Sequence, residues 1–139
     1  MIRIILSIVA GIIVAFLLIF AGDALFHALV PSAAQVPRNS EDPAAMAAYV
    51  TAQPTGVLVA LALSWAVATF VGAAIASRYA LRGWWPGLIA GGFVLLATAA
   101  NFVLVAHPTW MMALAIVAIC AAAWTGAKLF ARPHTGPIR

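Results

Sequence analysis

The stretch IILSIVAGIIVAFLLIFAG, residues 4–22, decides the fold of this chain. It contains nineteen consecutive uncharged residues. A helix of that length, rising about 1.5 Å per residue, crosses a hydrocarbon core of about 30 Å. The run is long for the apolar region of a signal peptide, although Gly22 and Ala24 give a weak cleavage pattern. We therefore interpret residues 4–30 as a retained membrane-spanning helix.

The rest of the chain is also strongly apolar. Of its 139 residues, 66% are hydrophobic and 7% are charged, whereas about a quarter of the residues in a soluble domain carry a charge. The charged residues occur in short stretches between apolar runs, which predict further spans at residues 55–77, 84–106 and 109–130. We predict an all-α integral membrane protein: a four-helix transmembrane bundle that forms a single membrane domain over residues 1–139.

The loop at residues 31–53 contains the signal for a shorter helix. Asp42 followed by Pro43 is typical of a helix start, and residues 44–52 are rich in alanine, a strong helix former. We expect a short interfacial helix on the membrane surface, with Tyr49 at headgroup depth. The tail at residues 131–139 is too short and polar to fold.

Basic residues are distributed unevenly between the two ends of the predicted bundle. One end receives Arg3, Arg78, Arg82, Lys128, Arg132 and Arg139, and the other receives Arg38 alone, beside Glu41 and Asp42. Lys and Arg are retained on the cytoplasmic side of bacterial membranes. The distribution predicts a multi-pass protein of the bacterial inner membrane, with both termini in the cytoplasm and the loop at residues 31–53 outside.

Composition and motifs argue against several classes of function. The net charge of +4 comes from basic residues spread over several loops, without the clustered stripe that nucleic-acid binding needs. The single cysteine, Cys120, excludes an internal disulfide and a multi-cysteine metal site, and the chain contains no Walker loop, GxSxG or HExxH motif. We predict no nucleic-acid partner and no cofactor. The expected partners are the lipid bilayer, a second copy of the chain or a larger membrane complex.

Small residues recur at four-residue spacing in the predicted spans. Helices in lipid gain nothing hydrophobic by touching one another, so close contact depends on small side chains. One interpretation is a generic tight bundle, and the other is a dedicated homodimer face. The residues predicted to make helix contacts are Gly11, Ser64, Gly72, Gly87, Gly91, Ala122 and Gly126.

Polar residues of the spans gather near the predicted exterior end. Asp23 and His27 lie four residues apart on one helix face, and His107 lies at the same level in the turn between the third and fourth spans. Together with Glu41 or Asp42 they could ligate a metal, or the two histidines could hold a haem. The alternative is structural, because an Asp–His pair near a helix C-terminus at headgroup level is stable without a ligand.

Asn101 lies about one and a half turns below His107, in the outer hydrocarbon layer. An amide at this depth needs partners for its donors and its carbonyl. We expect a hydrogen bond across the bundle to Ser64, Thr55, Asp23 or a backbone carbonyl. The centre of the bilayer holds no ionisable residue, which argues against a transporter built like the small multidrug exporters, whose acidic residue lies well inside the first helix.

Several of these features occur together in a known family. They are Asp23, the Pro- and Asp-containing loop, SWAVATFVGAAIASR at residues 64–78, Gly91-Gly92, Asn101, the turn His107-Pro108-Thr109-Trp110, and WTGAKL at residues 124–129. In this set, which extends over nearly the whole chain, the protein resembles uncharacterised four-span proteins of bacterial inner membranes. The resemblance implies the fold and carries no reaction, cofactor or partner.

The sequence therefore favours one functional interpretation and leaves two others open. We expect a non-enzymatic packing or oligomerising component, or an accessory subunit of a membrane assembly. The alternative is an exterior-facing ligand, metal or haem site formed by Asp23, His27, Asn101 and His107, and a small transporter is the lesser alternative. A polar cavity reaching Asp23, Asn101 and His107 would favour the ligand site, and a fully packed exterior end would favour the packing component.

Overall fold

The computed structural model describes residues 1–29 and 42–132. Regular structure in these residues is entirely helical. The helices are α1 (Ile2–Leu29), α2 (Pro43–Thr51), α3 (Thr55–Ala80), α4 (Trp85–Leu104) and α5 (Thr109–Phe130). All except α2 are long and apolar enough to cross a membrane, which confirms the prediction of an all-helical chain with four potential spans. The predicted features at Arg38, Asn39, Glu41 and in the tail from residue 133 lie outside the described residues.

Local capping and backbone conformation set the ends of these helices. Asp42 caps α2, because its Oδ1 accepts a hydrogen bond from the backbone N–H of Ala44 at 2.9 Å. Pro43 occupies the first turn, where its missing N–H costs no hydrogen bond. At the end of α3, Leu81 adopts a left-handed conformation with φ of 54°, and Gly83 follows with φ of 80°. The predicted short helix and its Asp42 cap are confirmed.

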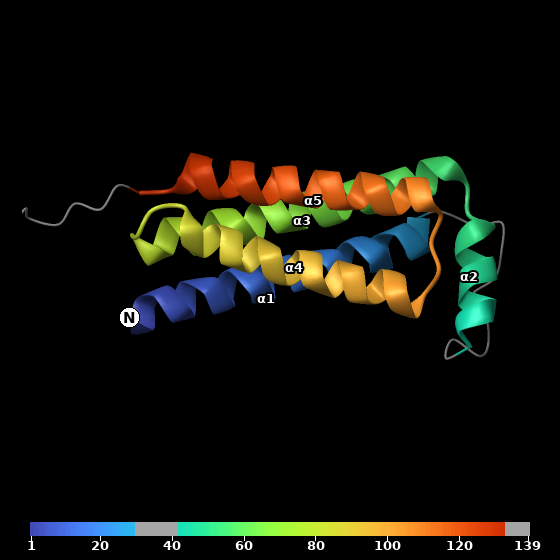
Figure 1. Ribbon diagram of the computed structural model, residues 1–139, viewed down its shortest axis with the longest axis horizontal. Helices are drawn as coiled ribbons and strands as arrows, with labels where there is room; N and C mark the ends of the chain where they lie inside the picture. Colours follow the sequence, from blue (N-terminus) through green and yellow to red (C-terminus); the bar gives the residue numbers. More distant parts are fainter. Residues whose placement is uncertain (30–41, 133–139) are drawn as a thin grey trace, which may run out of the picture.

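The long helices lie side by side, and α2 crosses one end of the bundle roughly perpendicular to them (Figure 1). That end also holds the end of α1 and the turn between α4 and α5, and we call it the α2 end. The opposite end holds the N-terminus and the connection between α3 and α4 (Figure 1). Helix α3 is central, because it contacts α1, α4 and α5 and has the most extensive contacts of the bundle, with α1 and α5. Half of its most apolar segment is buried, against 17% for α1.

Small residues bring α1 and α3 together in the half of the bundle away from α2. A Cβ added at Gly11 would lie 2.5 Å from the carbonyl oxygen of Gly72, and one added at Gly72 would lie 2.6 Å from that of Gly11. Both distances are too short for a real side chain. Ser7 and Ala15 continue the buried row on α1 at four-residue spacing.

Glycines make corresponding contacts among α3, α4 and α5. A Cβ at Gly91 would collide with Ala123, one at Gly126 would collide with the backbone of Phe70, and Gly87 lies against α3 and α5 in the same way. Ala122 and Ser64, also predicted as contact residues, are only partly buried. Ala123, rather than its neighbour Ala122, faces Gly91 because the helix rotation differs by about 100° between successive residues.

Larger side chains fill the bundle toward the α2 end. They form a buried apolar cluster that connects α2 with α3 and α5, and its members are Val50, Leu58, Ala62, Trp65, Met111, Ala115 and Ile119. This half of the structure therefore depends on bulky side chains, whereas the other half depends on close backbone approach.

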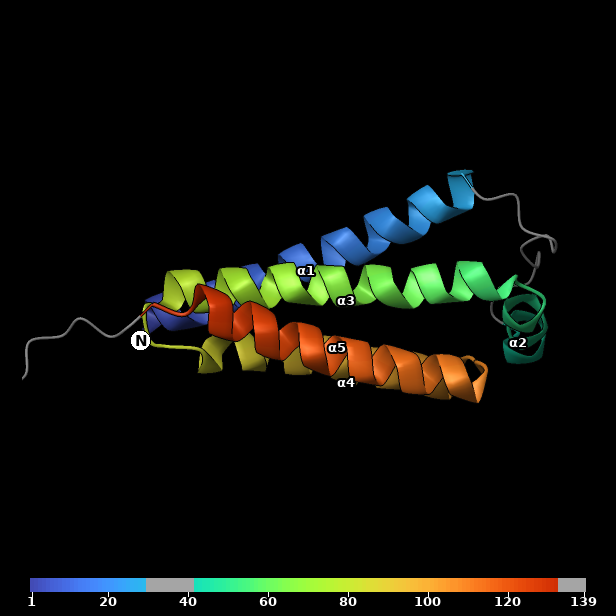
Figure 2. The same ribbon diagram turned by 90° about the horizontal axis from the view of Figure 1, so that it is seen from above.

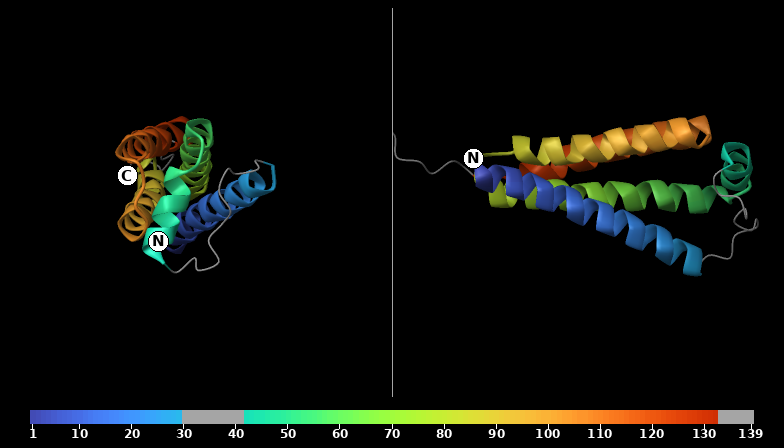
Figure 3. Two further views of the ribbon diagram at one scale, coloured as in Figure 1. Left: turned by 90° about the vertical axis from the view of Figure 1, so that its right-hand side faces the viewer. Right: turned by 90° about the horizontal axis from the view of Figure 1, so that it is seen from below.

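Helix α1 diverges from α3 toward the α2 end, as Figure 2 and the right-hand view of Figure 3 show. The small row on α1 ends at Ala15, and the next position in it is the bulky Ile19. A Cβ added at Gly22 would stand 3.5 Å from Oγ of Ser64, compared with 2.5 Å for the closest contact at Gly11. The divergence leaves the last turns of α1 beside open space, and Asp23 and His27 lie on those turns.

Candidate functional site

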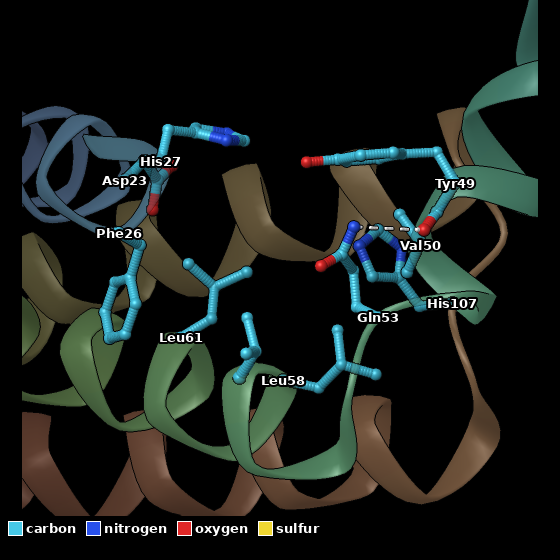
Figure 4. A pocket seen from close by; sticks show the side chains of 10 residues that line it. Asp23, Phe26, His27, Tyr49, Val50, Gln53, Leu58, Leu61 and His107 are labelled. Carbon is cyan, nitrogen blue, oxygen red and sulfur yellow. Dashed lines mark hydrogen bonds between the residues drawn. The ribbon is translucent and has the colours of Figure 1, made fainter. Parts of the chain in front are cut away.

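A cavity of about 120 Å³ lies at the α2 end, in the space beside the diverging part of α1. Its wall comes from α1, α2, α3 and the turn between α4 and α5 (Figure 4). The polar lining residues are Asp23, His27, Tyr49, Gln53 and His107. The structure thus brings Asp23 and His27 of α1 to one cavity with His107, which lies far from them in sequence.

The carboxylate of Asp23 interacts with α3. Its Oδ1 accepts a hydrogen bond from the indole Nε1–H of Trp65 at 3.3 Å. Trp65 is buried, and an indole N–H away from water needs an acceptor. A carboxylate can accept about four hydrogen bonds, so Asp23 keeps acceptor capacity for a further donor in the cavity.

His107 is held by its own turn and by an aromatic neighbour. Its Nδ1 lies 2.6 Å from the carbonyl oxygen of Val105. A carbonyl oxygen only accepts, so Nδ1 carries the proton, and Nε2 of the neutral ring is left as an acceptor. The ring also packs edge-on against Phe102, with ring centroids 5.1 Å apart. The ring of Phe102 in turn packs against that of Trp65, with centroids 6.2 Å apart. These three rings join the His107 turn to the residue that binds Asp23.

The remaining polar residues lie around the mouth of the cavity. His27 is exposed, and its ring points toward the hydroxyl of Tyr49 across the opening (Figure 4). The side-chain amide of Gln53 donates from Nε2 to the carbonyl oxygen of Tyr49 at 3.4 Å, which leaves Oε1 as an acceptor. The floor and sides are apolar, formed by residues such as Phe26, Leu58 and Leu61.

Asn101 lines a neighbouring cavity of about 170 Å³ between α1, α3 and α4, together with Asp23 and Trp65. Its side chain is partly buried, and it makes no hydrogen bond to another described residue. The expected bond to Ser64, Thr55 or Asp23 is therefore absent. Ser64 bonds instead to the carbonyl of Leu61 in its own helix at 2.8 Å. Asp23 and Asn101 instead lie on α1 and α4 around this cavity.

The predicted metal ligands share a cavity but do not meet at one point. Among residues 1–29 and 42–132, no group of three His, Cys, Asp or Glu side chains is arranged to hold a metal ion. Asp42 is engaged as the cap of α2, and Glu41 lies outside the described residues. Asp23 is hydrogen-bonded to an indole rather than to either imidazole. The cavity therefore presents separate acceptors, which suits a ligand that donates several hydrogen bonds better than a single ion.

Comparisons with known proteins place no further constraint on this site. No family model, curated protein or solved structure matches the chain. The site is therefore interpreted from its own geometry.

Sequence reasoning missed Trp65, Gln53 and Phe26 as parts of the site. A signal for Trp65 was present, because an indole N–H in the middle of an apolar run needs a polar partner. The relative rotation of α1 and α3 decides which residue accepts from that indole N–H. Asp23 and Trp65 are 42 residues apart, and the spacing of the sequence does not fix that rotation.

Proposed function

We propose that this chain is a non-enzymatic multi-pass membrane protein that binds a small hydrogen-bond-donating ligand, such as a primary ammonium group, in the cavity beside Asp23. The observation that carries the proposal is the convergence of Asp23, His27 and His107 on one cavity of an otherwise apolar bundle. A largely apolar cavity with a few convergent polar groups, rather than a packed end, is typical of a ligand site.

The chemistry of the wall favours a cationic donor. Oxygens of Asp23, Nε2 of His107 and Oε1 of Gln53 all remain able to accept hydrogen bonds. Asp23 also supplies negative charge, which attracts an ammonium group strongly where water is scarce. Apolar residues such as Leu58 and Leu61 would contact the hydrocarbon part of a short-chain ligand.

The proposal includes a location for the site. Basic residues cluster at the end opposite α2, where Lys128 and Arg82 lie, and the positive-inside rule assigns that end to the cytoplasm of a bacterial inner membrane. The cavity then opens to the exterior, and α2 lies on the membrane surface across its mouth. A ligand would reach Asp23 from that side of the membrane without crossing the bilayer.

The oligomeric role predicted from small residues is a separate proposal with weaker support. Gly11, Gly72 and Gly91 contact other helices of the same chain, so they offer no face to a second copy. Native mass measurement in mild detergent tests this role directly: a monomeric mass would exclude it.

Hexylamine, which is an ammonium ion at neutral pH, is a suitable probe for the cavity. We expect saturable binding to the full chain in phosphatidylcholine nanodiscs, measured by calorimetry. Asp23→Asn should weaken binding about tenfold, equivalent to about 1.4 kcal/mol, because it removes the charge while its amide oxygen still accepts from Trp65.

Asp42→Asn is the matched control for this experiment. It makes the same chemical change at the same end of the bundle, outside the cavity, and Asn caps a helix as well as Asp does. Equal affinity for hexylamine in wild-type and Asp23→Asn protein, or equal losses in the two variants, would contradict the proposal.

A further inference from the structure

Asp23 belongs to two cavities. Besides the cavity at the α2 end, it lines the neighbouring one of about 170 Å³, which lies deeper along the bundle between α1, α3 and α4. Phe16 lies at the far end of the deeper cavity on α1, seven residues before Asp23, which corresponds to about 10 Å along the helix axis. The two cavities thus follow α1 from its middle to its last turns, on either side of one carboxylate.

The deeper cavity is a groove between α1 and α4 that results from the divergence of α1. In Figure 2 the blue helix leaves the remaining three at an angle, and the distance grows toward the α2 end. Residues of α1 that follow the small row, from Phe16 to Phe20, are bulky and only partly buried or exposed. In a membrane this groove would open to the lipid between α1 and α4, whose side chains form its two sides.

The groove is apolar at depth and polar near the α2 end. Its deep walls are formed by residues such as Phe16, Ile19 and Val94, and its upper end carries Asp23 and Asn101. The amide of Asn101 has no hydrogen-bond partner among the described residues, although a partly buried amide at this level needs one. An amphiphilic molecule lying in the groove would supply that partner with its head and cover the apolar walls with its chain.

We infer that the ligand of this site is a single-chain amphiphile with a primary ammonium head, which enters from the bilayer between α1 and α4. Its head lies between Asp23 and Asn101, and its chain lies along Phe16, Ile19 and Val94. The hydrocarbon chain of the amphiphile exchanges contacts with lipid for similar contacts in the groove, so it contributes little to selectivity among ligands. Selection therefore resides in the head, through the acceptors of Asp23 and the upper cavity. This inference rests on the proposed function and adds the class of ligand and its route.

Photocrosslinking tests the inference on the full chain in phosphatidylcholine nanodiscs. The probe is dodecylamine carrying a diazirine in the middle of its chain, and the labelled residues are located by mass spectrometry. We expect adducts at residues 16–20 of α1 and 94–97 of α4. Unlabelled dodecylamine should compete with the probe, and Asp23→Asn should lower labelling about tenfold, whereas Asp42→Asn should not. A diazirine analogue of dodecyl sulfate should not label these segments selectively.

The substitution Ala97→Phe distinguishes binding in the groove from binding in the cavity at the α2 end. Ala97 lines the deeper cavity and not the one at the α2 end, so a phenyl ring there should block the chain of dodecylamine and leave hexylamine binding unchanged. Retention of the dodecylamine adducts in Ala97→Phe would contradict the inference. Labelling spread evenly over exposed positions outside these segments, such as Val103 and Val117, and independent of Asp23, would overturn it. If hexylamine still binds through Asp23 in that case, the proposed function stands, and if neither amine binds, both fail.

Discussion

Trp65 and Asp23 form the one hydrogen bond between side chains of two different long helices within the described residues. It fixes the carboxylate that both cavities share, and it satisfies the N–H of a buried indole. The bond is long, at 3.3 Å, and hydrogen bonds between membrane helices contribute on average about 0.6 kcal/mol in double-mutant cycles. Its contribution to stability is therefore small, and its main consequence is the position of the carboxylate.

A double-mutant cycle with Trp65→Phe and Asp23→Ala measures this bond. Phe retains an aromatic ring beside Phe102 and removes the donor together with part of the indole volume, and the cycle cancels the volume term because both Trp65→Phe proteins share it. We expect the two substitutions to be non-additive by about 0.6 kcal/mol in the free energy of unfolding. Reversible unfolding in mixed micelles gives the four values. Additive effects would show that the indole and the carboxyl do not interact.

The Asn101 side chain is expected to favour ligand binding at a cost in stability. Its amide has no described hydrogen-bond partner, and replacing an unsatisfied polar group with an apolar group of similar size is neutral or stabilising. We expect Asn101→Leu to raise the free energy of unfolding by up to about 1 kcal/mol and to weaken binding of dodecylamine severalfold. Thermal unfolding and calorimetry on the same preparation measure both. A loss of stability in Asn101→Leu would mean that the amide has a structural partner.

The sequence predicts well which segments form helices, but it predicts poorly how those helices are oriented relative to one another. Uncharged runs and the Asp42-Pro43 pair identify all five helices, because length, hydrophobicity and capping are local properties. The row from Ser7 to Ala15 also indicates which face of α1 is buried. The divergence of α1 after Ala15 is not local. It follows from how Ile19 and Gly22 meet α3, so the cavities, and the partner of Asp23, appear only in the assembled bundle.

Adjacent glycines in α4 provide a matched test of helix packing. A Cβ at Gly91 would collide with Ala123, whereas one at Gly92 would meet nothing within 4 Å. We expect Gly91→Ala to lower the free energy of unfolding by about 1–3 kcal/mol through overpacking. Gly92→Ala should raise it by about 0.5–1 kcal/mol, because alanine is the better helix former. Effects of the same sign and size, measured by thermal unfolding, would show that α5 does not pack on α4 in this register.

The two ends of the whole molecule differ in chemistry. At the end opposite α2, Lys128 Nζ lies 4.2 Å from the ring centroid of Trp84 and 4.7 Å from that of Trp124. At the same end, Arg3 Nε donates to the carbonyl oxygen of Tyr79 at 3.0 Å. Cations and tryptophans of this kind are common where a span meets the headgroups. The α2 end instead presents Asp23 and the histidines at its cavity. A bundle with such unlike ends is expected to insert in one orientation.

Reporter fusions test that orientation. We expect a reporter that works only in the cytoplasm to be active after Arg82 and after Arg139, and one that works only outside to be active after Asn39, because the basic residues of this chain lie almost entirely at one end. Using both reporters at each position provides the control, since every site must be positive with one and negative with the other. Cytoplasmic activity after Asn39 would place the cavity beside Asp23 on the inside. Binding of dodecylamine in nanodiscs, which have no inside, would be unaffected by that result, but the ligand would then have to come from the cytoplasmic leaflet.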